Sequence, residues 1–147
     1  MRLPTSTCRG YWRSRAYPSS VRGVFDHVLF DADDFDRSRA FYEMALAPLG
    51  MEVVSEPAPQ MVGFGADGKP TFWLMSRGRP TTQHAHVAFL APDRDAVDTF
   101  HAAGLAAGGI DNGAPGPRPI YHAAYYGAFV LDPDGNNIEA ACHTPVD

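Results

Sequence analysis

The sequence predicts an α+β fold made of two copies of one unit. Residues 25–50 and 84–109 align without a gap at a spacing of 59 residues and share ten identities in 26 positions. Each copy has the pattern of a strand followed by a helix, and short strand candidates separated by turns come after it. Because an internal repeat sets the architecture, we expect two β-α-β-β-β modules. Their curved mixed sheets should form a cleft, with the helices on the outer face.

The first strand and helix of each copy are the most clearly marked elements. The stretches "FDHVLF" (25–30) and "HAHVAFL" (84–90) are rich in β-branched and aromatic residues. Apolar residues at helical spacing follow, and glycine or proline ends both helices. Acidic candidates for the N-caps stand between strand and helix: Asp34 or Asp36 in the first copy, and Asp93 or Asp95 in the second.

Three shorter strands are expected after each helix. In the first copy these are "MEVVSE", "MVGFGA" and "TFWLMS"; in the second they are a weak strand near Ile110, "YYGAFVLD" and "NNIEAAC", with the turn "PDGN" between the last two. Alternation along a strand then places His27, His84, His86, Asn137 and Glu139 on faces opposite their apolar neighbours. We therefore expect polar side chains to gather on the sheet face that the helices leave open.

Composition and charge argue against a nucleic-acid partner and against a membrane-spanning segment. Residues 1–23 contain five arginines and no acid, so residues 24–147 carry 17 acidic side chains against seven basic ones. Such an acidic chain lacks the basic footprint that a nucleic acid requires. No apolar run is long enough to span a bilayer. The two cysteines, Cys8 and Cys142, form no disulfide framework, which favours a cytoplasmic location.

The domain organisation expected from these patterns is simple. Residues 1–23 have no apolar periodicity and are interpreted as a poorly ordered basic extension. It could be an artefact of the assigned start, with translation beginning at Val24, or an arm laid across a partner subunit. Residues 24–147 form one domain, made of modules 24–76 and 84–143.

Paired β-α-β-β-β units, with a histidine on each first strand and "DPDGNNIE" near the end, resemble the vicinal oxygen chelate superfamily. That superfamily includes glyoxalase I, extradiol dioxygenases, fosfomycin-modifying enzymes and bleomycin-binding proteins. In its metal-using members, the first and last strands of each module supply the ligands. The resemblance therefore implies that His27, His86 and Glu139 are ligands of a divalent metal ion, at three of the four positions.

The fourth ligand position departs from the family pattern. It falls in "TFWLMS", on Trp73 or alternatively on Phe72, and neither side chain binds a metal. In glyoxalase I-like members the carboxylates at the metal also move the substrate proton, so the loss of one disfavours a glyoxalase I reaction. Two imidazoles and one carboxylate can still hold Fe(II), Mn(II), Ni(II) or Zn(II) and leave positions open for a chelating substrate.

The remaining polar and aromatic residues of this face are the candidates for substrate contacts and proton transfer. His122 and Tyr126 are assigned as catalytic because a proton-transfer group is still needed. The expected substrate contacts are Trp73, Tyr125, Asn137 and His84. Tyr125 and Tyr126 alternate along a strand, so at most one of the two lines the cleft.

Two functions of different classes remain open from the sequence. The first is a metalloenzyme of lyase, isomerase or ring-cleaving dioxygenase type that acts on a small oxygen-chelating molecule. The second is a metal-free protein that sequesters a drug or metabolite in an aromatic cleft. In either case we expect a homodimer, in which the modules pair within one chain or between two chains.

Overall fold

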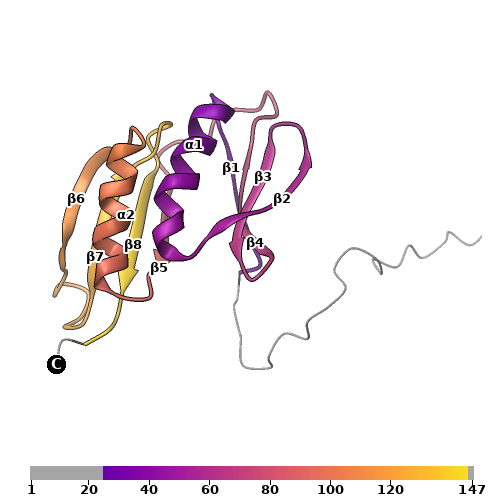
Figure 1. Ribbon diagram of the computed structural model, residues 1–147. Coiled ribbons are helices and arrows are strands. Elements are labelled where there is room, and N and C mark those ends of the chain that lie inside the picture. Colours follow the sequence, from indigo (N-terminus) through magenta and orange to yellow (C-terminus); the bar gives the residue numbers. More distant parts are fainter. Residues whose placement is uncertain (1–24, 146–147) are drawn as a thin grey trace, which may run out of the picture.

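The computed structural model describes residues 25–145 and contains the two expected modules (Figure 1). The basic extension predicted at residues 1–23 lies outside the described residues. The first module comprises β1 (Val28–Asp31), α1 (Phe35–Leu46), a 3-10 turn η1 (Ala47–Leu49), β2 (Glu52–Ala58), β3 (Met61–Ala66) and β4 (Lys69–Met75). The second comprises β5 (His86–Leu90), α2 (Arg94–Ala106), β6 (Ile110–Pro117), β7 (Tyr126–Leu131) and β8 (Asn137–Cys142).

Each module has its own four-stranded mixed sheet, and the two sheets have the same topology. The strand orders are β1-β4-β3-β2 and β5-β8-β7-β6. In both sheets the first strand pairs in parallel with the last, and the other neighbours are antiparallel. The α+β fold of two repeated modules predicted from the sequence is therefore confirmed.

The two helices begin where the sequence predicts, and the first acidic candidate is the N-cap in each case. The Asp34 side chain accepts a hydrogen bond from the backbone N–H of Arg37 at 3.0 Å. The Asp93 side chain accepts one from Ala96 at 2.8 Å. Each bond satisfies an amide that has no partner within its helix. At the end of η1, Gly50 adopts a left-handed conformation with φ of 77°, which glycine tolerates because it has no Cβ.

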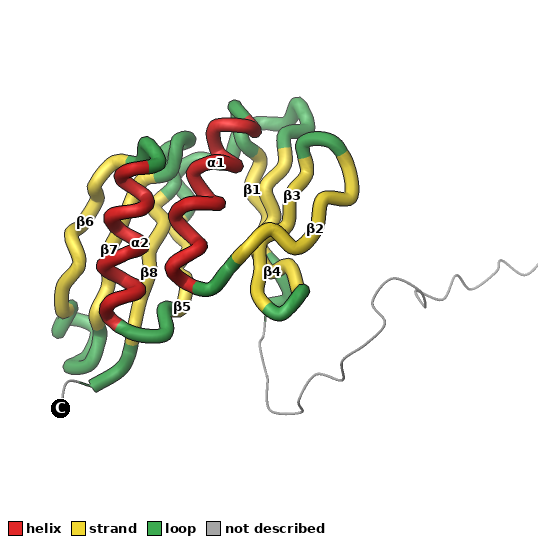
Figure 2. The backbone as a smooth tube through the Cα atoms, in the orientation of Figure 1, coloured by secondary structure: helices red, strands yellow, loops and turns green. Residues whose placement is uncertain are grey.

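The two helices lie side by side on one side of the sheets (Figure 2). The hydrophobic core is formed by buried residues of the helices and strands. Helix α2 packs on β6, β7 and β8, and α1 packs against α2 and β4. Alternate strand residues such as Phe72, Val130, Ile138 and Ala140 point into this core and are at most 1% exposed. The opposite sheet face carries the polar positions, as the alternation predicts.

A buried carboxylate joins the two modules. The hydroxyl of Tyr42 on α1 donates to Asp132, in the turn between β7 and β8, at 2.5 Å. The Asn136 side chain donates to the same carboxylate at 2.9 Å and to the backbone carbonyl of Thr82 at 2.8 Å. Burial, and then the charge of Asp132, holds the pKa of Tyr42 well above its usual range. This network fixes the orientation of the second module relative to α1.

Neither α1 nor α2, the helices of the described part of the chain, is long and apolar enough to cross a membrane.

Candidate functional site

In the second module, the predicted metal ligands His86 and Glu139 lie in direct contact. Strands β5 and β8 run parallel with Ala88 opposite Glu139 and His86 opposite Asn137, so His86 and Glu139 are diagonal neighbours on the open sheet face. The His86 Nε2 lies 2.8 Å from Glu139 Oε2. The imidazole side chain is 51% exposed, whereas the carboxylate side chain is only 4% exposed. The pair therefore has a solvent-facing imidazole and a buried acid.

Tyr125 covers the other oxygen of this carboxylate. Its hydroxyl donates a short hydrogen bond to Glu139 Oε1. A Cβ on Gly127 would lie 3.1 Å from the Tyr125 ring and 3.2 Å from Glu139 Oε1, so glycine at this position leaves the space that the pair occupies. Burial, followed by the bond to Glu139, raises the pKa of Tyr125 well above its usual range. The phenol is therefore a stable donor that orients the carboxylate.

Asn137 and Phe129 complete this face around Glu139. The Asn137 side-chain oxygen accepts a hydrogen bond from Asn112 at 3.1 Å. Phe129 lies opposite Glu139 in the pairing of β7 with β8, and its ring centroid is 6.1 Å from that of His86 in an edge-on arrangement. The open face of the second module thus combines a carboxylate, an imidazole, a phenol and an amide around one aromatic ring.

His27 lies in the first module, immediately before β1. Its Nδ1 is 2.8 Å from Asp26 Oδ1, and its side chain is half-exposed. The hydrogen bond with His27, and then one with Lys69, holds the pKa of Asp26 below its usual range. A carboxylate on Nδ1 orients the ring so that Nε2 is the atom available to a further partner, as is common for metal-binding histidines.

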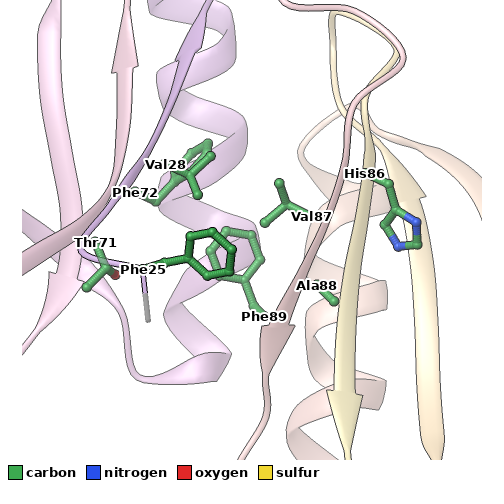
Figure 3. A pocket seen from close by; sticks show the side chains of 8 residues that line it. All are labelled: Phe25, Val28, Thr71, Phe72, His86, Val87, Ala88 and Phe89. Carbon is green, nitrogen blue, oxygen red and sulfur yellow. The ribbon is translucent and has the colours of Figure 1, made fainter. Parts of the chain in front are cut away.

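A single chain does not assemble the three predicted ligands. Among residues 25–145, no group of three histidine, cysteine, aspartate or glutamate side chains is placed to hold a metal ion. Figure 3 shows the reason. Val87 and Phe89 on β5 point toward the first module, whereas His86 points to the opposite side. His86 and Glu139 therefore come together, and His27 of the same chain does not join them.

A pocket of about 410 Å³ lies between the modules, but it is not where the polar groups gather. Its lining comes from β1 and the residues just before it, from β4 and from β5 (Figure 3). It consists of Phe25, Val28, Thr71, Phe72, His86, Val87, Ala88 and Phe89. His86 only borders it, because its ring points away. The candidate site is therefore the open face around Glu139 and not this apolar pocket.

Trp73 lies on the open face of the first module. It is half-buried, whereas its neighbours Phe72 and Leu74 are each 1% exposed in the core. The indole covers Gly63 on β3, where an added Cβ would lie 2.9 Å from the ring. Of the two residues proposed for the missing ligand position, Trp73 is therefore the one on the face with His27.

The structure separates the two neighbouring tyrosines. Tyr126, expected to be catalytic, points to the helix side, where its hydroxyl donates to Asp98 on α2 at 2.8 Å and its ring lies beneath the Arg94 guanidinium at 4.8 Å. Side chains alternate along β7, and Phe129 of this strand lies on the open face with Glu139, so Tyr126 points to the other face. Tyr125, assigned to substrate binding, instead contacts Glu139 directly.

The two other predicted histidines lie in loops. His84 precedes β5 in a left-handed conformation with φ of 58°, which interrupts the strand alternation used to place it beside His86. His122 Nε2 lies 2.9 Å from His143 Nδ1, and both imidazoles contact the Tyr125 ring, with centroids 5.5 and 5.0 Å away. His122 thus borders the site through Tyr125, and His84 does not contact Glu139.

The donors of the second module fit part of a metal site. Two ligands about 2.1 Å from a tetrahedral ion lie about 3.4 Å apart, and the His86 and Glu139 atoms are 2.8 Å apart. The half-exposed imidazole can make this small adjustment. The hydrogen bond from Tyr125 to the second carboxylate oxygen is the outer contact that orients such a ligand. The pair therefore suits an ion that takes further ligands from elsewhere.

Comparison with known proteins gives the class of this chain. The sequence model of the Glyoxalase/Bleomycin resistance protein/Dioxygenase superfamily matches residues 24–140, and the chain belongs to this superfamily. This confirms the resemblance inferred from the repeated strands. No curated protein sequence matches the chain.

Solved structures with the same fold include several from this superfamily. A glyoxalase/bleomycin resistance protein from Albidiferax ferrireducens is 30% identical with a TM-score of 0.71, covering 83% of this chain and all of its own. A lactoylglutathione lyase from Agrobacterium tumefaciens is 23% identical with a TM-score of 0.58, covering 82% of this chain and 93% of its own. A glyoxalase/dioxygenase from Nostoc punctiforme is 20% identical with a TM-score of 0.60, covering 92% of this chain and all of its own. The last two likenesses concern the fold alone.

Proposed function

We propose that this protein is an enzyme that uses a divalent metal ion to act on a small molecule chelating through adjacent oxygen atoms. The observation that carries the proposal is the Glu139 carboxylate, which is 3% exposed and bonded to His86 and Tyr125. Burying a carboxylate is costly unless it is paired. A bound cation would stabilise the buried carboxylate more than the half-exposed imidazole of His86 does.

His27 of a second copy supplies the third ligand in this proposal. Within one chain, His86 points away from the first module (Figure 3). His27 is half-exposed and held through Nδ1 by Asp26. The two modules share one topology, so a two-fold dimer can set the first module of one copy against the second module of the other. Such a homodimer would hold two equivalent sites.

In this arrangement the chain's own residues have distinct tasks. Glu139 and His86 hold the ion, and Tyr125 keeps the carboxylate in position through its hydroxyl. His122, beside the Tyr125 ring, is the candidate for proton transfer, because an imidazole can both donate and accept a proton. The ion, when bound, would polarise the substrate's oxygen atoms. Fe(II), Mn(II), Ni(II) and Zn(II) all suit two imidazoles and one carboxylate.

Metal analysis of the full chain purified without chelators tests the proposal. We expect about one divalent ion per chain, together with its loss in Glu139→Gln, which removes the charge but can still accept the Tyr125 hydrogen bond. Glu43→Gln, on the exposed surface of α1, is the matched control and should keep the ion. A wild-type chain that binds no divalent ion in titration, or a Glu139→Gln variant with unchanged affinity, would contradict the proposal.

A metal-free binding protein is the second candidate, and Trp73 is the observation that favours it. Its indole covers part of the open face of the first module at the position of the missing ligand, and such a ring can stack on a planar ligand. The same metal titration separates the two functions, because this candidate requires no ion. Ligand binding that is indifferent to divalent metals and to Glu139→Gln would support it.

A further inference from the structure

Arg118 lies at the edge of the candidate site, just after β6. Its guanidinium carbon is 5.5 Å from the centroid of the Phe129 ring. Two of its nitrogens donate to backbone carbonyls, Nη1 to Pro117 at 3.2 Å and Nη2 to Ala114 at 2.6 Å. These contacts hold a partly buried cation in one place across the open face of the second module.

Among the described residues, this cation forms no ion pair. Within residues 25–145, no carboxylate lies at ion-pair distance from Arg118, whereas Arg39 contacts Glu43 and Glu56, and Arg77 contacts Asp31. A guanidinium has five N–H donors, and the two carbonyl contacts leave others for a ligand. A partly buried arginine with spare donors is suited to receive an anion from outside the chain.

The guanidinium also shares its surroundings with Glu139. Gly116 on β6 lies opposite Gly127 on β7. A Cβ on Gly116 would lie 3.1 Å from Arg118 Nη1, and a Cβ on Gly127 would lie 3.2 Å from Glu139 Oε1. Directly opposed residues project to the same face of a sheet. Arg118 and Glu139 are therefore neighbours on the open face, over two opposed glycines whose missing Cβ atoms leave the space that these side chains and the Tyr125 ring occupy.

We propose that Arg118 binds the anionic end of the substrate, so that the substrate is a small organic acid. The inference rests on the proposed function, because the oxygen atoms that bind the ion would lie toward His86 and Glu139. A carboxylate can bond to the fork of a guanidinium through both oxygens.

A paired ligand measurement tests this assignment. Benzoate and benzamide have nearly the same shape and differ in charge, and their affinities for the full chain can be measured by calorimetry or NMR titration. We expect benzoate to bind about 10-fold or more tightly than benzamide. The ratio should fall to near one in Arg118→Gln and recover in part in Arg118→Lys. Arg94→Gln is the matched control, because Arg94 likewise covers an aromatic ring, that of Tyr126, but on the helix side, and it should keep the full ratio.

The outcomes separate this inference from the proposed function. Equal binding of the two probes to the wild type, no binding of either, or a preference that persists in a folded Arg118→Gln variant would each overturn the anion site. If Arg118 only tied the end of β6, its replacement would lower the melting temperature without changing the ratio. Metal affinity should not fall in Arg118→Gln, because the guanidinium is no metal ligand and its removal takes away a neighbouring positive charge. A wild-type chain that prefers benzoate but binds no divalent ion would refute the proposed enzyme and leave the anion site standing.

Discussion

Trp73 and Glu139 occupy equivalent positions in the two modules. In the first module β4 pairs with β1 so that Trp73 lies opposite Leu29, and in the second β8 pairs with β5 so that Glu139 lies opposite Ala88. Leu29 and Ala88 are themselves 59 residues apart, which is the spacing of the repeat. One module therefore carries an indole where the other carries a carboxylate.

Replacing Trp73 by glutamate should add a carboxylate beside His27 and keep the fold. The side chain lies on the open face over Gly63, so the new charge does not enter the core. We expect the free energy of unfolding to fall by about 1–3 kcal/mol through lost aromatic packing, while divalent-metal affinity rises. Metal titration and melting curves measure both effects.

Phe72→Glu is the control for the direction in which these side chains point. Phe72 is 1% exposed and packs between Phe30 and Tyr42, so an unpaired charge there should unfold the protein. Unfolding of the Trp73→Glu variant, without any gain in metal affinity, would mean that the assignment of the fourth position is wrong.

Removal of the Tyr125 hydroxyl should weaken metal binding, because that hydroxyl orients Glu139. Outer-shell contacts of this kind contribute about 10- to 100-fold in metal affinity, which is the loss we expect in Tyr125→Phe. Tyr126→Phe also removes a tyrosine–carboxylate bond, but to Asp98 on the helix side, and should leave the metal affinity at the wild-type value. Equal metal affinities in the two variants, measured by calorimetric titration, would exclude a positioning role for Tyr125.

Mixing two defective variants tests whether the site is shared between chains. His27→Ala keeps His86 and Glu139, and His86→Ala keeps His27, so only a dimer containing one of each can form an intact site. We expect neither variant alone to bind the ion tightly. After denaturation and joint refolding, the mixture should recover about a quarter of the wild-type capacity, the fraction given by random pairing of two-fold dimers. No recovery in a mixture that is shown to form mixed dimers would place His27 outside the metal site.

The Asp31–Arg77 pair should give the fold an acid-dependent component of stability. The bond from Arg77 lowers the pKa of Asp31 below its usual range, at contacts of 2.9 and 2.6 Å. A depressed carboxyl pKa contributes stability above the unfolded value of about 3.9, and this contribution is lost as the pH falls through the folded value. Asp31→Asn should therefore be less stable than wild type at pH 7 and differ less from it below about pH 4. Urea unfolding at both pH values provides the measurement, and a constant difference would exclude the linkage.

The sequence by itself determined the modules, the helix starts and the face of most site residues. Three features depend only on residues close together in the chain. These are the repeated strand and helix, the N-caps Asp34 and Asp93, and the alternation that puts Glu139 and Ile138 on opposite faces of the sheet. Local backbone geometry governs such features, so their period is visible in the sequence. The same alternation left Tyr125 and Tyr126 as alternatives, since it separates two neighbours without saying which of them faces the helices.

Only the tertiary structure decided how these pieces meet. In the folded chain Tyr125 donates its hydroxyl hydrogen bond to Glu139, and Tyr126 donates its own to Asp98. The path of the loop after β6 places the guanidinium of Arg118 over the Phe129 ring. It also turned His86 away from the first module of its own chain. Loop paths and the packing of α1 on α2 set these relationships, and they depend on contacts between residues far apart in sequence, which no local period encodes.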